Sequence, residues 1–205
     1  MAGRLLEDDP AAAHGHSAAA RGLAARLAVV REATGVTAYR SARYAEALGE
    51  LRALRRMTGS AEYLPVMADC ERGLGRPERA LALAEDPAVR RLDRAGQVEM
   101  RIVAAGARRD LGQVDAALMT LRAGSDLDRS TVEDWTPRLW YAYADALLAA
   151  DREQEAREWF LAAASVDDDG LTDAEERLAV LGARSHEARP DHHGPERGSA
   201  AGPQT

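Results

Sequence analysis

The acidic run SVDDDGLTDAEE, residues 165–176, comes closest to a chemically active pattern in this sequence. It overlays a calcium-binding loop, with Gly170 at the sharp turn and carboxylates at four ligand positions, Asp167, Asp169, Asp173 and Glu176. The overlay is imperfect, because Ser165 replaces the first aspartate and Thr172 replaces a branched apolar residue. An acidic turn followed by a Thr172–Glu175 helix capping box explains the same letters, and we favour that interpretation.

Histidine and cysteine offer weaker candidates for a reactive or metal-binding site. His14 and His16 lie two residues apart on an expected helix, so they point to different sides. The single cysteine, Cys70, cannot form a disulfide within the chain, and we expect a packed side chain and not a reactive thiol. The other histidines fall in a polar tail, where a solvated chain binds metals only weakly: His186, His192 and His193.

Several classes of protein are disfavoured by motif and composition. No GxSxG, HExxH, Walker or dinucleotide-binding fingerprint occurs, so we expect neither catalysis nor a cofactor or metal. The net charge of −7, without a concentrated basic face, argues against a nucleic-acid partner. No apolar run is long enough to span a bilayer, and no secretory signal pattern opens the sequence, so we expect no membrane partner and a cytoplasmic location.

The elements that would position any site recur along the chain. Each unit reads as a helix, a short turn marked by Gly or Asp, and a second helix with an alanine at a fixed offset. These alanines follow one another at intervals of 34, 33, 37 and 39 residues: Ala13, Ala47, Ala80, Ala117 and Ala156. Such a period predicts an all-α chain built as an α-solenoid of antiparallel helix pairs. Only 4% of residues are aromatic, so alanine replaces bulky rings at the helix crossings.

The last unit, with Ala156 in its second helix, fits a known repeat best. Its helices place aromatic, small and leucine residues at intervals of three, four and seven, so that they share one face: Trp140, Tyr143, Ala144, Leu147, Phe160 and Ala163. This order resembles the tetratricopeptide (TPR) repeat. The resemblance implies a right-handed superhelix of about four repeats, with a partial repeat before them and a capping helix after them.

The other units match this repeat less closely. The unit of Ala47 has Gly35 in the small position and Arg31 where the first aromatic residue is expected. The unit of Ala117 likewise has Arg101 in the aromatic position. In the unit of Ala80, Pro87 should end the second helix early, because proline lacks an amide donor and clashes with the preceding turn.

These signals divide the chain into four segments. Residues 1–27 form a partial repeat, with a short stub over 1–6 and a helix that begins at Asp9 and Pro10. Residues 28–170 hold the TPR-like repeats, and residues 171–182 the capping helix, which we expect to end at Gly182. Residues 183–205 are polar and should be disordered.

The resemblance also implies where a partner would bind. In TPR proteins the first helices of successive units line a concave groove that holds a peptide. Here the corresponding positions are Glu32, Val36, Tyr39, Arg40, Glu62, Asp69, Arg72, Ile102, Arg109, Arg138, Tyr141 and Asp145. Tyr39 and Tyr141 are the favoured contacts, since their rings bury much area at a small entropic cost. The family's clamp for a terminal carboxylate uses Lys and Asn, and this sequence contains neither.

Two functions follow as expectations. The first is a non-catalytic scaffold or adaptor that binds a protein or peptide of unknown identity in the groove, with self-association as a further option. The second is a regulatory arm that senses a peptide or small ligand and acts on an effector carried by another chain.

Overall fold

The computed structural model describes residues 9–24, 26–124 and 126–187, and all regular structure within these ranges is helical. This confirms the all-α class. The expected stub over 1–6 and the tail beyond 187 lie outside the described residues. The elements are α2 (Pro10–Ala24), α3 (Ala28–Arg40), α4 (Tyr44–Thr58), α5 (Leu64–Gly73), α6 (Pro77–Ala84), the 3₁₀ helix η1 (Pro87–Arg91), α7 (Arg94–Asp110), α8 (Val114–Arg122), α9 (Thr136–Ala149), α10 (Glu153–Ala164) and α11 (Ala174–Glu187).

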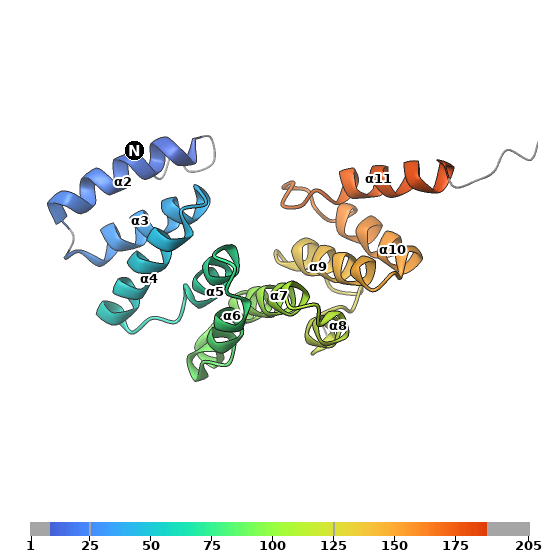
Figure 1. Cartoon of the computed structure of the whole chain (residues 1–205), viewed down its shortest axis with the longest axis horizontal. Helices are drawn as coiled ribbons and strands as arrows, with labels where there is room; N and C mark the ends of the chain where they lie inside the picture. Colours follow the sequence, from blue (N-terminus) through green and yellow to red (C-terminus); the bar gives the residue numbers. More distant parts are fainter. Residues whose placement is uncertain (1–8, 25, 125, 188–205) are drawn as a thin grey trace, which may run out of the picture.

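The helices follow one another around an open arc (Figure 1). Each α-helix packs against the next in the chain, and α5 also packs against α7, and α7 against α9. In Figure 1, α3, α5, α7 and α9 lie toward the inside of the arc, whereas α6 and α8 lie outside. We call the side formed by α3, α5, α7 and α9 the inner face.

The same turn joins the two helices of a pair at four places. One residue in each turn has a left-handed φ between 55° and 73°: Ala42, Gly75, Gly112 and Asp151. The amide of the residue that follows this left-handed residue donates a hydrogen bond of 2.8 to 3.0 Å. Its acceptor is the carbonyl oxygen of the residue four positions before the left-handed residue. This bond is typical of a helix end closed by a left-handed residue. Four equal turns therefore set one repeated geometry between paired helices.

The five spaced alanines lie at the helix crossings. Ala13, Ala47, Ala80, Ala117 and Ala156 are each 0% exposed. The last four of these alanines belong to three apolar clusters, one over α3–α5, one over α5–α7 and one over α7–α11. The third cluster contains every residue quoted above for the last unit, including Trp140 and Phe160. A methyl side chain at each crossing lets the helices approach closely, as the sequence predicted.

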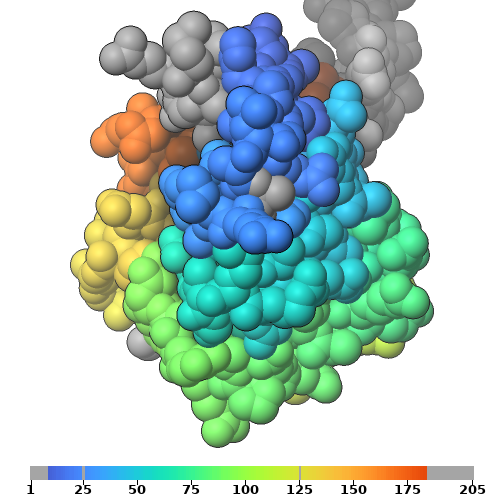
Figure 2. Space-filling view, turned by 90° about the vertical axis from the view of Figure 1, so that its left-hand side faces the viewer, coloured from blue at the N-terminus to red at the C-terminus, as the bar shows by residue number. Residues whose placement is uncertain are grey.

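Proline and aspartate place several helix ends as expected. α6 ends at Ala84, and η1 begins at Pro87, so the early stop is confirmed. At the start of α2, Asp9 Oδ1 accepts a hydrogen bond from the amide of Ala12 at 2.9 Å, which confirms the aspartate cap. Figure 2 shows α2 at one end of the molecule, above α3 and α4.

The last helix differs from its prediction at both ends. α11 continues through Gly182 to Glu187, so the expected stop at Gly182, and disorder from 183, are wrong for residues 183–187. A glycine within a helix lowers its stability without ending it when the flanking residues favour helix. α11 begins at Ala174, so the residue before the helix is Asp173 and not Thr172, and the expected position of the capping box is wrong. The Thr172 hydroxyl instead donates to Asp167 Oδ2 at 2.7 Å.

Among these helices, within the ranges that the structure describes, none has the length and apolar character needed to cross a membrane.

Candidate functional site

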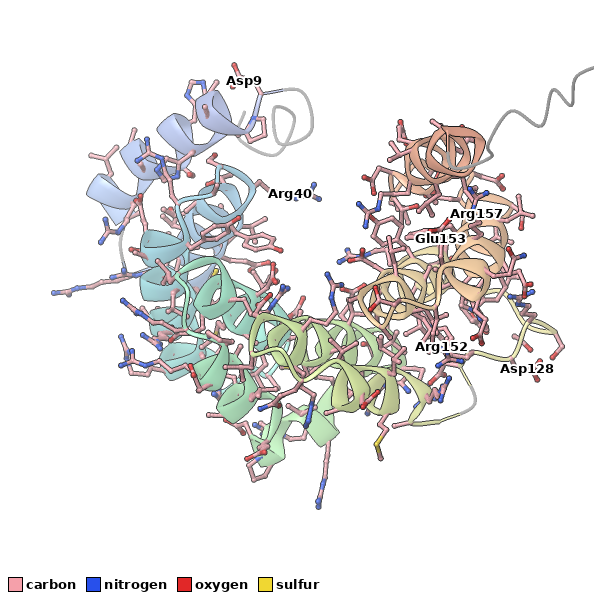
Figure 3. The ribbon with its side chains drawn as sticks, turned by 45° about the vertical axis from the view of Figure 1, so that its right-hand side comes forward. Asp9, Arg40, Asp128, Arg152, Glu153 and Arg157 are labelled. Atoms are coloured by element: carbon pink, nitrogen blue, oxygen red, sulfur yellow. The ribbon has the colours of Figure 1, made fainter. Side chains whose placement is uncertain are left out.

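Eleven of the twelve residues predicted for a groove belong to the helices of the inner face, and the twelfth, Glu62, lies in the turn before α5. None of them is fully buried; Arg40, Glu62 and Arg138 are exposed, and the other nine are half-buried. Figure 3 shows Arg40 reaching from the end of α3 toward the opposite arm of the arc. The half-buried residues are mostly engaged with one another, through contacts that join one inner helix to the next.

Two tyrosine hydroxyls join α3 to α5 and to the turn before α5. Tyr39 donates to Asp69 Oδ2 at 2.7 Å, and Tyr63 donates to Glu32 Oε1 at 2.7 Å. Burial raises the pKa of both tyrosines, and the neighbouring carboxylates raise it further. Both hydroxyls therefore keep their protons and act as donors. Tyr39 is thus partly committed to holding the fold, and its ring also lies 6.2 Å from that of Tyr44.

Arg72 joins α5 to α7. Its Nε and Nη2 donate to the two carboxylate oxygens of Asp110 at 2.8 and 3.2 Å, and its Nη1 donates to Asp69 at 2.9 Å. Two parallel bonds to one carboxylate fix the plane of the guanidinium group. Together with Tyr39, these contacts link three successive inner helices.

Gly106 makes room for this arginine. A Cβ placed on Gly106 would lie 2.5 Å from Cζ of Arg72 and 2.7 Å from its Nη1. The Arg72 guanidinium therefore rests directly on the backbone of α7, which a larger residue would prevent. Glycine weakens a helix interior, so close approach is the physical reason for its presence here.

Asp145 joins α7, α9 and α11. It forms ion pairs with Arg109 of α7 and with Arg177 of α11. The Tyr141 hydroxyl, one helical turn earlier, is hydrogen-bonded to Asp173, and the Tyr141 ring packs 5.3 Å from Phe160. Burial, followed by the carboxylate of Asp173, raises the pKa of Tyr141. The sequence prediction placed Asp145 and Tyr141 on one face, and the structure ties both to α11 or its preceding turn.

Among the three predicted groove arginines that form ion pairs, Arg138 has the most exposed side chain. Its Nη2 lies 2.8 Å from Glu99 Oε2, and its side chain is 48% exposed. Burial raises the pKa of Glu99, while Arg138 opposes this shift. The pair therefore sits at the edge of the inner face, with the carboxylate inside and the guanidinium facing outward.

The links obey the repeat spacing, with one exception. Val36, Asp69, Gly106 and Asp145 stand at the same offset before the turns of their units. Two units have an aspartate at this offset, and each aspartate binds a side chain of the preceding inner helix. Asp69 binds Tyr39, and Asp145 binds Arg109. At the α5–α7 junction the same offset holds Gly106, and Arg72 passes across it to Asp110, one helical turn later.

A cavity of about 640 Å³ opens on the inner face. It gathers half of the predicted groove residues from α5, α7 and α9: Arg72, Ile102, Arg109, Arg138, Tyr141 and Asp145. The turn before α11 adds Leu171, Thr172 and Asp173. The groove residues of α3, including Glu32 and Val36, do not line it.

Cys70, considered above for reactive chemistry, is buried, and Asp167, considered for calcium binding, is bonded to the protein's own backbone. Cys70 is 0% exposed, and burial, with Asp69 next in effect, raises its pKa to about 12, which keeps the thiol protonated. Asp167, in the acidic run, accepts hydrogen bonds from the amides of Leu171 and Thr172 at 2.7 and 2.8 Å. In the described part of the chain, no group of three or more His, Cys, Asp or Glu side chains is placed to hold a metal ion.

No family model matches this chain, and no curated protein matches it.

Sequence reasoning missed several residues of the inner face. Glu99 could have been found, because it stands 37 residues after Glu62, the same interval that separates Ala80 from Ala117. The repeat interval gives no such indication for Asp110 and Gly106, because their unit has different residue types at these positions from the neighbouring units. Tyr63, Asp173 and Arg177 lie in turns or in α11, where the repeat gives no position for them.

Proposed function

We propose that this chain is a TPR-like α-solenoid, a right-handed superhelix of four helix pairs, that works as a non-catalytic adaptor in the cytoplasm. It binds a segment of another protein on its inner face. The observation that supports the proposal most is the fourfold recurrence of one turn together with one buried alanine per crossing. Equal turns repeat one geometry within each helix pair, and stacking such pairs side by side lines their first helices up along one surface.

The composition of the inner face suits a protein segment. Tyrosine, arginine and carboxylate side chains alternate over α3–α9, beside an apolar floor that includes Ile102 and Ala142. Tyrosine and arginine are enriched at the energetic centres of protein interfaces. Arg40, Glu62 and Arg138 are exposed and can contact a partner without disturbing the core.

A regulatory arm that senses a small ligand is a second candidate. It is favoured by the volume of the cavity, about 640 Å³, which falls within the range of about 300 to 1,000 Å³ of small-molecule sites. Such a ligand would lie between α7 and α9 and alter their packing. The effector would then be a separate chain.

Site-specific photo-crosslinking tests the adaptor. A benzophenone amino acid replaces Arg138 on the inner face or, as the matched control, Met119, which is 72% exposed on α8 at the outside of the arc. Circular dichroism checks that both variants keep their helices. After irradiation in native cells, we expect one defined protein adduct from position 138 and none from position 119.

Two other results would contradict the adaptor. Equal adducts at both positions would show contact without a preferred face. No protein adduct at 138, together with a small molecule retained in native mass spectra, would favour the sensing arm instead.

A further inference from the structure

The helices at the two tips of the arc each belong to an incomplete pair. α2 holds the place of a second helix, because its Ala13 lies 34 residues before Ala47 of α4. α11 follows α10, the second helix of the last pair, and so holds the place of a first helix. α2 packs chiefly against α3, and α11 against α10 (Figure 1). Among the described residues, α2 therefore has no first helix beside it, and α11 has no second helix.

α11 carries the small residue at which a second helix crosses a first. A small residue recurs in the first helices at intervals of 33, 37 and 39 residues, and α11 continues the series after 38 more: Gly35, Ala68, Ala105, Ala144 and Gly182. A Cβ added to Gly35 would lie 2.7 Å from Cδ2 of Leu51, so α4 rests directly on this glycine. A Cβ added to Gly182 would meet nothing within 4 Å. The crossing point on α11 is therefore open.

α2 exposes the face that other second helices turn toward their first helices. Three residues after the buried alanine of α4, Glu50 pairs with Arg31 of α3. At the same position in α10, Trp159 packs edge to face on Trp140 of α9, with 5.9 Å between the ring centroids. The corresponding residue of α2 is His16, and it is exposed.

The exposed face continues along α2. Seven residues after the alanine, Leu54 of α4 and Ala163 of α10 are buried, whereas Ala20 of α2 is exposed. One turn later, Leu23 is 93% exposed. A first helix supplied from elsewhere would cover this face and remove the leucine from water.

The two ends of the molecule carry opposite charge. Residues 9–58 contain eight Arg and four Asp or Glu residues, a formal charge of +4, whereas residues 150–187 contain four Arg and eleven Asp or Glu residues, a formal charge of −7. Ion pairs do not remove this difference. In the described ranges no ion pair engages the exposed Arg26, Arg40 and Arg56 at the first end, or five exposed carboxylates at the second: Glu158, Asp168, Asp169, Glu175 and Glu176. Each end therefore attracts the opposite end of a second copy.

An antiparallel pairing of α2 with α11 would bring unpaired charges together. Paired helices in this fold run antiparallel, so a second helix ends beside the start of its first helix. Arg26 follows the end of α2, and Glu175 and Glu176 lie in the first turn of α11. The same alignment that completes the pair thus places an unpaired arginine beside two unpaired carboxylates.

We propose that α11 of one copy pairs with α2 of a second copy, so that two incomplete ends form one further helix pair. The two surfaces differ, so a dimer keeps one free end of each kind, and the contact can repeat from head to tail. It uses neither the cavity nor the links of the inner face. The inference therefore goes beyond the adaptor function and is tested apart from it.

Sedimentation velocity of the full chain tests for the contact. At about 100 μM protein, a contact with a micromolar Kd is largely occupied. We expect the mean mass to rise with concentration above that of one chain. Added salt should reverse this rise, because it screens the attraction between the ends.

Two substitutions each block one side of the contact. Ala20→Glu acts on α2, and Gly182→Glu acts on α11. Both positions are open, and glutamate favours a helix more than glycine does, so both variants should keep the fold, which melting curves check. Each variant alone should self-associate at least about tenfold more weakly, because the contact would bury an unpaired carboxylate.

An equimolar mixture of the two variants distinguishes a head-to-tail contact from a symmetric one. The intact α11 of the Ala20→Glu copy can pair with the intact α2 of the Gly182→Glu copy. The remaining two ends both carry the added glutamate. We therefore expect the mixture to form dimers and no larger species. Met119→Glu, which adds the same charge on α8 at the outside of the arc, is the control and should associate like the native protein.

Four results would overturn the inference. A mass of one chain at about 100 μM would show that copies do not pair. A dimer that persists in both variants would indicate a symmetric contact elsewhere. Failure of the mixture to dimerise would separate α2 from α11. A sedimentation coefficient that changes with salt at constant mass would assign the opposite charges to attraction within one arc.

Discussion

At the scale of single residues, two turns place a side chain where glycine is favoured. Ala42 and Asp151 have φ values of 55° and 57°, in the left-handed region, and Gly75 and Gly112 hold the same place in the other two turns. An L-residue with a Cβ in this conformation loses about 1 to 2 kcal/mol through contact with the following carbonyl oxygen. Aspartate tolerates it better than alanine, because its side chain bonds locally.

Ala42→Gly should therefore stabilise the protein by about 0.5 to 1 kcal/mol, after the greater entropy of the unfolded glycine chain is subtracted. Urea denaturation measures the change. Gly112→Ala is the reverse control and should cost about 1 kcal/mol; a Cβ at Gly112 would meet nothing within 4 Å, so only the backbone is tested. Loss of stability in Ala42→Gly would argue against strain in this turn.

Asp167 stabilises the turn between α10 and α11 in a pH-dependent manner. Burial opposes its ionisation, but hydrogen bonds from the Thr172 hydroxyl and the amides of Leu171 and Thr172 hold the pKa of Asp167 below its ordinary value. A carboxyl group with a lowered folded pKa contributes stability above its unfolded pKa, and this contribution disappears as the pH falls through the folded pKa.

Asp167→Ala should thus destabilise the protein by about 1 kcal/mol at neutral pH, through loss of these bonds. The difference from the native protein should narrow below about pH 4, where the unfolded carboxyl takes up its proton. Denaturation curves over this pH range provide the measurement. A difference that stays constant with pH would mean that the carboxylate charge is irrelevant to the turn.

At the scale of elements, α2 is attached differently from the other helices. None of its described residues belongs to the three apolar clusters. It is held by polar contacts instead: Ser17 to Thr37 at 2.7 Å, Arg21 to Glu50 at 2.7 Å, and His14 to Glu46 at 3.3 Å. Hydrogen bonds and ion pairs add less net stability than buried apolar area, because water competes for the same groups.

We expect the amides of α2 to exchange with deuterium earlier than those of α9, which lies in the largest cluster. Added salt should speed the exchange of α2 further, since it weakens the Arg21–Glu50 pair. Hydrogen exchange followed by mass spectrometry resolves the two helices. Exchange of α2 and α9 at one common rate would show that the chain opens as a single unit.

Ala156 tests the helix crossing of the last pair. Its side chain is fully buried between α9 and α10, so Ala156→Leu should destabilise the protein by about 1 to 3 kcal/mol through overpacking. Ala149→Leu, at the exposed end of α9, is the control and should change stability by less than about 0.5 kcal/mol. Equal melting temperatures for the two variants would be incompatible with a tight crossing at Ala156.

At the scale of the whole molecule, the inner face has two roles that must be separated. Tyr39 and Tyr141 offer rings to a partner, yet their hydroxyls hold Asp69 and Asp173. A loss of binding on truncation could therefore come from either the lost contact or the altered arc. Replacement by phenylalanine keeps the ring and removes only the hydroxyl, which distinguishes these causes.

The double change Tyr39→Ala with Tyr141→Ala should reduce recovery of the partner severalfold, because two aromatic contacts are lost. The double phenylalanine variant should retain most of the binding if the rings make the contact. Quantitative pull-down from native cells, with melting curves for both variants, checks this. Partner recovery that survives the alanine changes would move the binding surface elsewhere.

The sequence by itself determined the helix pairs. Each turn residue, and the apolar pattern around each buried alanine, is a local signal that acts within one or two helical turns. The recurrence of these signals at matched intervals marks out the pairs. Pro87 and Asp9 likewise fixed an end and a start through backbone chemistry alone. Gly182 misled the prediction, since helix propensity around one glycine is too weak a signal to mark an end.

Only the tertiary structure decided which inner-face side chains engage each other. Tyr39 and Asp69, Arg72 and Asp110, and Arg109 and Asp145 are 30 to 38 residues apart, and their pairing depends on how far each helix is rotated against the next. At Gly106 that rotation sends Arg72 one helical turn farther than the spacing implies. Periodicity gives the face on which a residue lies, whereas packing between helices decides its partner, because partners belong to elements that meet only after folding.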